Sequence, residues 1–398
     1  MTKNIVLCTD GTWNGPGELD TDDKSAPTTN VFKLFLNLAG VDTPSTYKLA
    51  KEQERTLTGK DGTIQQAAKY LDGVGDSDNF LVHALGGSLG AGLITRIVRG
   101  YTFVSRNYIA GDKIFLTGFS RGAYTARALA GLIAAKGLID ATRLDLSDKN
   151  AAYRLGAAVW YQYRRGALQT KAGLLDDLAN FVVDLPGFFG KPPTGDKLIA
   201  APIEAIGVWD TVGALGIPAY NMNMVRVDLF EFADTKLSNV VGRAFHAIAV
   251  DEQRGDFTPT FWDTDPRVTQ VLFPGAHADV GGGYPTTNNE SGLSDRTLQW
   301  MIAQFAALGV QFAASPTYVP KPDCRGAAHQ PWTSPPFDNL PRGLRTLAPG
   351  YSLAQFVIDR MRAGPVIANP GLAPTQYLPA NLNAYVASGA AAPGITVV

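Results

Sequence analysis

Cysteine, histidine and long apolar runs are scarce in this chain of 398 residues. Its two cysteines, Cys8 and Cys324, are too few for a disulfide framework or a thiolate zinc site. The apolar run near the N-terminus, residues 5–8, is too short for a signal-peptide core, and no stretch approaches the roughly 20 apolar residues of a membrane span. We therefore expect a protein that stays in the cytoplasm or is exported without a Sec signal peptide.

An excess of one charge sign is absent as well. The formal net charge is −1 and no basic run occurs, which argues against nucleic acid as the main partner. Hydrophobic residues make up 45% of the chain, enough for a large core and too many for wholesale disorder. The glycine-rich segment 86–92 lacks the Gly-Lys-Ser/Thr ending of a phosphate loop, and we expect no cofactor.

Short apolar runs alternate with longer helical patterns along the chain. This order predicts an α/β fold of the α/β-hydrolase type, with a mainly parallel sheet flanked by helices. The expected strands are Ile5–Cys8, Ala67–Leu71, Lys113–Thr117, Ala205–Trp209 and Val268–Phe273. The expected helices are Asn30–Leu38, Leu89–Asn107, Leu237–Val250 and Ser291–Leu308.

Two regions interrupt this alternation within what we predict to be one domain, residues 1–398. Residues 140–203 are too long for a simple crossover and are expected to be an insertion, either packed on the body or acting as a lid whose apolar segment 181–189 meets a greasy substrate. The C-terminal region 312–398 holds 13 of the 25 prolines, which limits regular structure. We expect it to be a tail packed on the body, in which Ser352–Met361 is helical.

The segment around Ser120 has the pattern strand, sharp turn, helix. Gly118, Ser120 and Gly122 form the G-x-S-x-G pattern of a nucleophile elbow, in which the serine sits in a strained turn and small flanking residues let strand and helix approach. The following helix is rich in alanine and glycine and can pack tightly on the sheet. The alternative for Ser120 is a helix N-cap in an ordinary turn.

Four histidines are available as the base that a serine nucleophile needs. In this fold the acid and then the histidine follow the serine along the chain, which removes His83. His246 falls in a helical pattern and His329 in the proline-rich tail. His277 follows an apolar strand within a glycine-rich loop, and it is our predicted base.

The acid is predicted to be Asp210, which stands directly at a strand end between Ser120 and His277 in sequence. A carboxylate there can hold the imidazole in the needed tautomer and stabilise its cation. Asp279 is the main competitor, but two residues from His277 it is better placed to support the site loop Gly281–Gly283. Asp251, Asp256 and Asp263 have poorer strand contexts.

Two backbone donors are expected to stabilise an oxyanion beside Ser120. One is the N–H of Arg121, the residue after the nucleophile. The other is the N–H of Gly11 or Thr12, in the tight turn after the first strand. Asp10 is expected to brace that turn.

Four ordered blocks of the sequence together look familiar. They are C-T-D-G-T-W-N at 8–14, L-T-G-F-S-R-G-A-Y-T-A-R at 116–127, G-V-W-D-T-V-G at 207–213 and F-P-G-A-H-A-D-V-G-G-G-Y at 273–284. The chain thereby resembles the α/β-hydrolase family that includes the catalytic domain of type VI secretion phospholipase effectors. Residues 356–362 and 377–383 also fit the family's closing pattern. The resemblance implies a serine esterase or phospholipase with the triad Ser120, Asp210 and His277.

The leading hypothesis is hydrolysis of carboxylic esters, either of lipids or of small soluble molecules. A lipid substrate implies transient contact with a membrane surface. The sequence does not predict the oligomeric state. A second hypothesis is metal-dependent phosphoester hydrolysis, with Asp10, Asp210, His277 and Asp279 as ligands. A third is a non-catalytic binding protein on a hydrolase fold.

Overall fold

The computed structural model describes residues 2–11, 27–43, 52–73, 88–168, 192–212, 218–220, 226–228, 235–335, 337–338, 341–347, 351–382 and 396–398. Within these ranges ten strands form one sheet, in the order β16-β13-β12-β11-β8-β5-β1-β4-β3-β2. From β4 to β16 all neighbours are parallel, and β3 and β2 extend the other edge in antiparallel fashion. The predicted α/β fold with a mainly parallel sheet is confirmed.

The strands of the sheet are β1 (Asn4–Thr9), β2 (Val41–Thr43), β3 (Gln53–Thr58), β4 (Ile64–Leu71), β5 (Lys113–Phe119), β8 (Ile203–Trp209), β11 (Val241–Ala249), β12 (Val268–Phe273), β13 (Ser352–Leu353) and β16 (Thr396–Val397). Three small two-stranded pairs lie outside it: β6 (Leu138–Ile139) with β7 (Leu198–Ile199), β9 (Pro218–Tyr220) with β10 (Arg226–Asp228), and β14 (Pro365–Val366) with β15 (Thr375–Gln376). All five predicted strands are present, and Val268–Phe273 has the predicted bounds.

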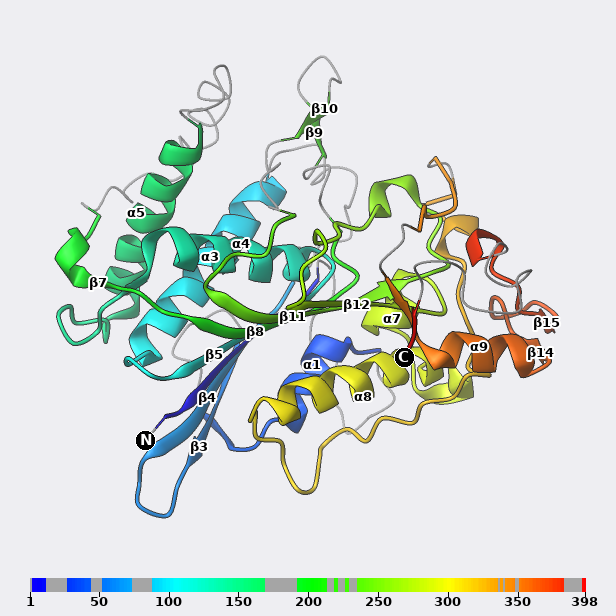
Figure 1. Cartoon of the computed structure of the whole chain (residues 1–398), viewed down its shortest axis with the longest axis horizontal. Coiled ribbons are helices and arrows are strands. Elements are labelled where there is room, and N and C mark those ends of the chain that lie inside the picture. Colours follow the sequence, from blue (N-terminus) through cyan, green and yellow to red (C-terminus); the bar gives the residue numbers. More distant parts are fainter. Residues whose placement is uncertain are drawn as a thin grey trace.

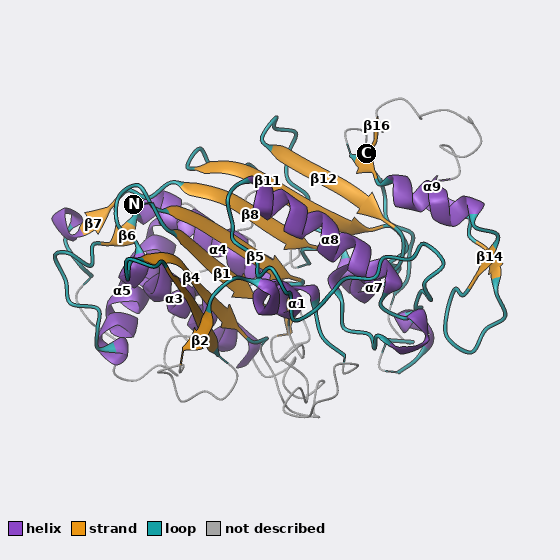
Figure 2. Cartoon of the chain, turned by 90° about the horizontal axis from the view of Figure 1, so that it is seen from below, coloured by secondary structure: helices purple, strands orange, loops and turns teal. Residues whose placement is uncertain are grey.

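Helices cover both faces of the sheet (Figure 1). One face carries α3 (Ser88–Asn107), α4 (Arg121–Lys136) and α5 (Lys149–Leu168), and the other carries α1 (Asn30–Asn37) and α8 (Gly292–Ala307). Figure 2 shows α1 and α8 lying across the strands on that second face. The short α7 (His277–Gly281) and α9 (Gln355–Arg362) complete the set of described α-helices. Single-turn 3-10 helices lie at Gly195–Lys197, Gly255–Phe257, Thr287–Asn289, Pro331–Thr333 and Ala380–Leu382.

The protein has two hydrophobic cores, one on each face of the sheet. They follow from the alternation of side chains along each strand. In β1, Ile5 and Leu7 belong to the core under α3 and α4, whereas Val6 and Cys8 belong to the core under α1 and α8. Because successive side chains of a strand point to opposite faces, a strand covered on both sides must be apolar throughout. This explains why β1 appears in the sequence as an unbroken apolar run.

The predicted helix Leu237–Val250 is wrong. Val241–Ala249 is instead the strand β11, paired in parallel with β8 and β12. A contiguous apolar run is compatible with either a buried helix or a central strand, and periodicity alone does not separate the two. Burial between two strands decided the outcome, since Ala244 to Ala249 are all buried.

The described residues of the insertion (140–203) and of the C-terminal tail (312–398) pack against the rest of the domain. From the insertion, α5 buries Val159 and Trp160 in the core shared with α3 and α4. From the tail, β13 and β16 extend the sheet, and the helix expected over Ser352–Met361 is preceded by β13 and begins at Gln355. The apolar segment 181–189 lies outside the described residues, and both the lid and the division into domains stay predictions.

Candidate active site

Ser120 occupies a strained turn between β5 and α4. Its φ of 57° and ψ of −123° lie outside the regions that non-glycine residues favour. A Cβ at Gly118 would lie 2.4 Å from the carbonyl oxygen of Gly122, and a Cβ at Gly122 would lie 2.2 Å from that of Thr9. Both positions therefore require glycine, and the local geometry is the one that the G-x-S-x-G pattern predicts.

Asp210 and His277 form a buried hydrogen-bonded pair. Asp210 directly follows β8 with a φ of 38°, and His277 is the first residue of α7 after β12. The distance between His277 Nδ1 and Asp210 Oδ2 is 2.5 Å. The imidazole is also in contact with the rings of Phe119 and Phe257, whose centroids lie 4.5 and 5.0 Å from its own. The structure thus brings together the predicted acid and the predicted base.

Ser120 lies next to this pair. Its N–H donates to the carbonyl oxygen of Trp209, the residue before Asp210, over 3.1 Å. The ring of Phe119, the residue before Ser120, is the one that contacts His277. Because β5, β8 and β12 run parallel, their carboxyl ends meet at one edge of the sheet, where ligands of open α/β sheets bind.

Arg345 is a partner of Asp210 that the sequence analysis missed. Its Nη1 and Nη2 donate to Asp210 Oδ1 and Oδ2 over 2.6 and 2.9 Å, and the same nitrogens donate to the carbonyl oxygens of Ala249 and Phe257. Burial opposes ionisation of Asp210, but Arg345 and His277 outweigh it and hold the pKa of the carboxyl well below its usual range. Asp210 is therefore ionised at neutral pH.

His277 is held from its backbone as well as from its ring. Its N–H donates to Glu252 Oε2 over 3.1 Å, and Glu252 is fixed in turn by the guanidinium of Arg254. Burial lowers the pKa of His277 below its ordinary value, although the Asp210 carboxylate acts in the opposite direction. At neutral pH the imidazole is uncharged, and with its Nδ1–H donated to Asp210 its Nε2 can accept a proton.

The turn after β1 is organised by the Asp10 carboxylate. Gly11 N–H donates to Asp10 Oδ1 over 2.8 Å, and the hydroxyls of Thr29 and Tyr70 both donate to Oδ2 over 2.6 Å. Burial raises the pKa of Asp10 to about 7 in spite of these bonds. Thr12 lies outside the described residues.

The two predicted oxyanion donors differ in their surroundings. Arg121 is the first residue of α4, so its N–H belongs to the first turn, where backbone donors have no intrahelical acceptor. The N–H of Gly11 is already engaged by Asp10. Their roles in catalysis stay predictions.

Of the other histidines, His246 and His329 have partners of their own, and His83 lies outside the described residues. His246 is a buried residue of β11, not of a helix, and its Nε2 accepts the N–H of Thr211 over 3.1 Å. Burial lowers its pKa to about 3, so it is neutral. His329 Nδ1 lies 2.7 Å from an oxygen of Asp279, and its ring stacks on Tyr284.

Asp279 supports the loop that carries His277. Its Oδ2 accepts the N–H groups of Ala276 and His329, over 2.8 and 3.0 Å. The four side chains of the metal hypothesis are thus divided, with Asp10 bound to Thr29 and Tyr70, Asp279 bound to His329, and Asp210 bound to His277. No three or more His, Cys, Asp or Glu side chains within the described ranges form a group that could hold a metal ion.

A family model supplies the decisive comparison. The model for the catalytic domain of Tle1-like phospholipase effectors of the type VI secretion system matches residues 3–304. The chain belongs to this family. The match spans the Ser120, Asp210 and His277 segments.

Three proteins similar to this chain are themselves longer than it. A Saccharomyces cerevisiae protein described as "Uncharacterized protein YEL023C" is 26% identical over 271 residues, which is 68% of this chain and 34% of the yeast protein. A solved structure of an uncharacterized Pseudomonas aeruginosa protein is 18% identical to this chain, with a TM-score of 0.44. The match covers 78% of this chain and 46% of the Pseudomonas chain. The solved structure of the Tle1 effector bound to the VgrG spike is 18% identical to this chain, with a TM-score of 0.39. The match covers 71% of this chain and 51% of the solved chain.

The chain spans about a third of the yeast relative and about half of each of these solved chains. Among the helices of the described ranges, none is long and apolar enough to cross a membrane.

Proposed function

We propose that the chain is a serine hydrolase that cleaves carboxylic esters of lipids through an acyl-enzyme. The observation that carries this proposal is the buried Asp210–His277 pair at the sheet edge where the strained Ser120 turn lies. His277 is neutral and oriented by an ionised carboxylate, the state that a general base requires.

In the proposed reaction, His277 Nε2 takes the hydroxyl proton as Ser120 Oγ attacks the ester carbonyl carbon. The resulting oxyanion is stabilised by the N–H of Arg121 at the start of α4, where the helix dipole also favours negative charge. A second donor, Gly11, would have to turn its N–H from Asp10 towards the oxyanion. The intermediate then expels the alcohol, which receives the proton from His277.

Water completes the cycle. His277 removes a proton from a water molecule, the hydroxide attacks the acyl carbon, and the acid leaves as Ser120 recovers its proton. Asp210 stabilises the imidazolium at each transfer, and Arg345 keeps that carboxylate in place. No step requires a cofactor.

Lipid or phospholipid acyl esters are the proposed substrate class because the chain belongs to a phospholipase effector family. Contact with a membrane surface and export without a Sec signal fit the same family. The metal-dependent alternative is less well supported because its four ligands are divided among three hydrogen-bonded groups, and only Asp210 and His277 are bonded to each other.

The test is a panel of p-nitrophenyl esters and phospholipids, run on the wild type and on Ser120→Ala. We expect Ser120→Ala to lose on the order of 10⁴-fold or more in kcat/KM and all labelling by a fluorophosphonate probe. Ser334→Ala, at an exposed serine, is the matched control and should retain full activity. Undiminished ester hydrolysis by Ser120→Ala would overturn the proposal, and loss of activity with a chelator alone would favour the metal-dependent alternative.

A further inference from the structure

His329, in the C-terminal tail, is bonded to the helix that carries His277. Its Nδ1 lies 2.7 Å from Asp279 Oδ1, and its backbone N–H donates to Asp279 Oδ2 over 3.0 Å. Asp279 is the third residue of α7, and His277 is the first. A residue that follows Asp279 by 50 positions in the chain therefore contacts the same short helix as the proposed base.

The Asp279 carboxylate fixes the beginning of α7. Its Oδ2 also accepts the N–H of Ala276, the residue before His277, over 2.8 Å. The Asp279 side chain is fully buried, and a Cβ at the preceding Gly275 would lie 2.4 Å from that of Asp279, so the loop and the carboxylate pack closely together. Because α7 has five residues and its first turn contains both side chains, a displacement of Asp279 also displaces His277.

His329 is itself held by two further side chains. Its Nε2 lies 3.3 Å from Glu290 Oε2, and its ring stacks on Tyr284 with 3.3 Å between centroids and 10° between planes. Burial opposes a charge on the imidazole, but Asp279 and Glu290 outweigh it and raise the pKa of His329 above its ordinary value. The protonated ring donates to both carboxylates, and the neutral ring can keep its Nδ1–H on Asp279.

His277 is thus supported at two places. Its ring is bonded to Asp210, which Arg345 holds, and its helix is bonded through Asp279 to His329. Both Arg345 and His329 lie beyond residue 304, where the match to the family model ends. The tail therefore supplies one support for the acid and another for the helix that carries the base.

We propose that His329 is a positioning residue for His277. By holding Asp279, it fixes the N-terminal end of α7 and with it the orientation of the imidazole towards Asp210 and Ser120. Its importance for turnover rests on the proposed function, in which His277 is the base and small displacements of reacting groups are costly. The alternative is that His329 only packs the tail on the rest of the domain, so that its loss affects stability and nothing else.

Three replacements of His329 test the proposal. The amide nitrogen of asparagine lies nearly where imidazole Nδ1 lies and can donate to Asp279, that of glutamine corresponds to Nε2, and leucine carries no donor. In His329→Leu we expect kcat for a p-nitrophenyl ester to fall about tenfold, with KM within about twofold of the wild type. His329→Asn should recover most of this loss and His329→Gln little of it. A larger loss is not expected, because the backbone N–H of residue 329 still donates to Asp279.

A second measurement does not depend on ester hydrolysis. The Nδ1 proton of His277, which lies in a bond of 2.5 Å to Asp210, should give a proton NMR signal far downfield that is lost in His277→Gln. We expect His329→Asn to keep this signal and His329→Leu to shift or broaden it. Activity retained by Ser120→Ala would contradict the proposed function alone, because the signal reports the geometry of His277 independently.

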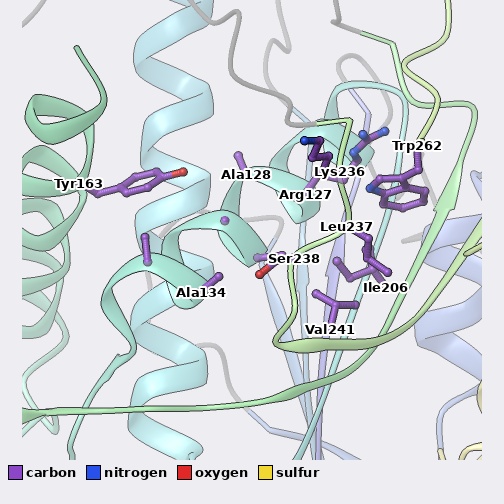
Figure 3. Close-up of a pocket in the computed structure, with 13 residues that line it drawn as sticks. Arg127, Ala128, Ala134, Tyr163, Ile206, Lys236, Leu237, Ser238, Val241 and Trp262 are labelled. Atoms are coloured by element: carbon purple, nitrogen blue, oxygen red, sulfur yellow. The ribbon is translucent and has the colours of Figure 1, made fainter. Parts of the chain in front are cut away.

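The matched control replaces a half-buried polar residue by leucine away from the candidate site. Ser238 lines a pocket of about 320 Å³ beside α4, together with Ala128 and Ala134 of that helix (Figure 3). None of the three proposed triad residues lines this pocket, and its volume leaves room for a larger side chain. Ser238→Leu should therefore keep both the kcat and the His277 signal of the wild type.

Circular dichroism and urea unfolding show whether each variant is folded. If folded His329→Leu keeps both the kcat and the His277 signal of the wild type, the proposal is wrong and His329 only packs the tail. Equal kcat in His329→Asn and His329→Gln would also overturn it. If His329→Leu does not fold, the comparison of the asparagine and glutamine variants decides.

Discussion

The guanidinium of Arg345 donates hydrogen bonds to both oxygens of the Asp210 carboxylate, with Nη1 2.6 Å from Oδ1 and Nη2 2.9 Å from Oδ2. Both side chains are buried, and the two residues are 135 positions apart in the chain. A residue of the proline-rich tail thereby positions a residue at the end of a central strand. The candidate site is completed by a segment that supplies none of its proposed catalytic groups.

Replacement of Arg345 should therefore affect both stability and turnover. In Arg345→Met the Asp210 carboxylate keeps His277 and the Ala249 N–H but loses its buried counter-ion, and we expect a loss of about 3 kcal/mol in the free energy of unfolding. Ester hydrolysis should fall at least tenfold. Urea unfolding and kcat/KM for a p-nitrophenyl ester measure the two effects.

The matched control for this prediction is Arg342→Met, at an exposed arginine of the same segment, which should change neither quantity. Arg345→Lys keeps the charge but not the two parallel bonds, and it should recover only part of the loss. Full recovery with lysine would contradict the role assigned to the bidentate geometry.

The backbone at Ser120 should favour glycine. Because φ is 57° and ψ is −123°, a Cβ is strained there, and we expect Ser120→Gly to be about 1 kcal/mol more stable than Ser120→Ala, although both are inactive. Thermal or urea unfolding of the pair measures the difference. The same comparison at Ser334, where φ is −135° and ψ is 152°, should favour alanine instead. Equal stability of the two Ser120 variants would mean that the turn relaxes.

The pH profile of ester hydrolysis should reflect the lowered pKa of His277. The proposed base works in its neutral form, so kcat/KM rises as pH rises through the pKa of the imidazole in the free enzyme. Since burial lowers that pKa from the ordinary value of 6.5, the acidic limb should have its midpoint below pH 6.5. The rates are measured with an uncharged ester, and circular dichroism confirms that the protein is folded at each pH. A midpoint above 6.5 would contradict the prediction.

Asp10 should make folding less favourable as pH rises. Its pKa is about 7 in the folded chain and about 3.9 when unfolded, so between these values the folded state binds more protons than the unfolded state. Stability then falls with rising pH, by at most about 1.4 kcal/mol per pH unit, and this loss is complete above pH 7.

In Asp10→Asn this dependence should disappear, so the difference in unfolding free energy between the variant and the wild type should shift in favour of asparagine from pH 4 to pH 7. Urea unfolding at several pH values measures it. The control is Asp61→Asn, at an exposed aspartate of the β3–β4 turn, for which no such shift is expected. A difference that is constant with pH would show that Asp10 is ionised throughout this range.

Much of this arrangement could be predicted from local sequence. The strands β1, β5, β8 and β12 are predicted as short apolar runs, each followed within two residues by glycine or aspartate, so the sequence indicates both the strands and the loops at their carboxyl ends. Parallel pairing then requires those loops to share one edge of the sheet. Ser120, Asp210 and His277 follow from that rule together with chain order.

Other features were decided only by the tertiary structure. Val241–Ala249 became a strand because β8 and β12 pair with it along both edges, a context that its own residues do not reveal. The contact between Arg345 and Asp210 joins distant segments without any local pattern, and the cavity beside α4 depends on which alanines face the core. Local composition determines which element a segment can form, whereas burial, ion pairing and cavities depend on the neighbours that folding supplies.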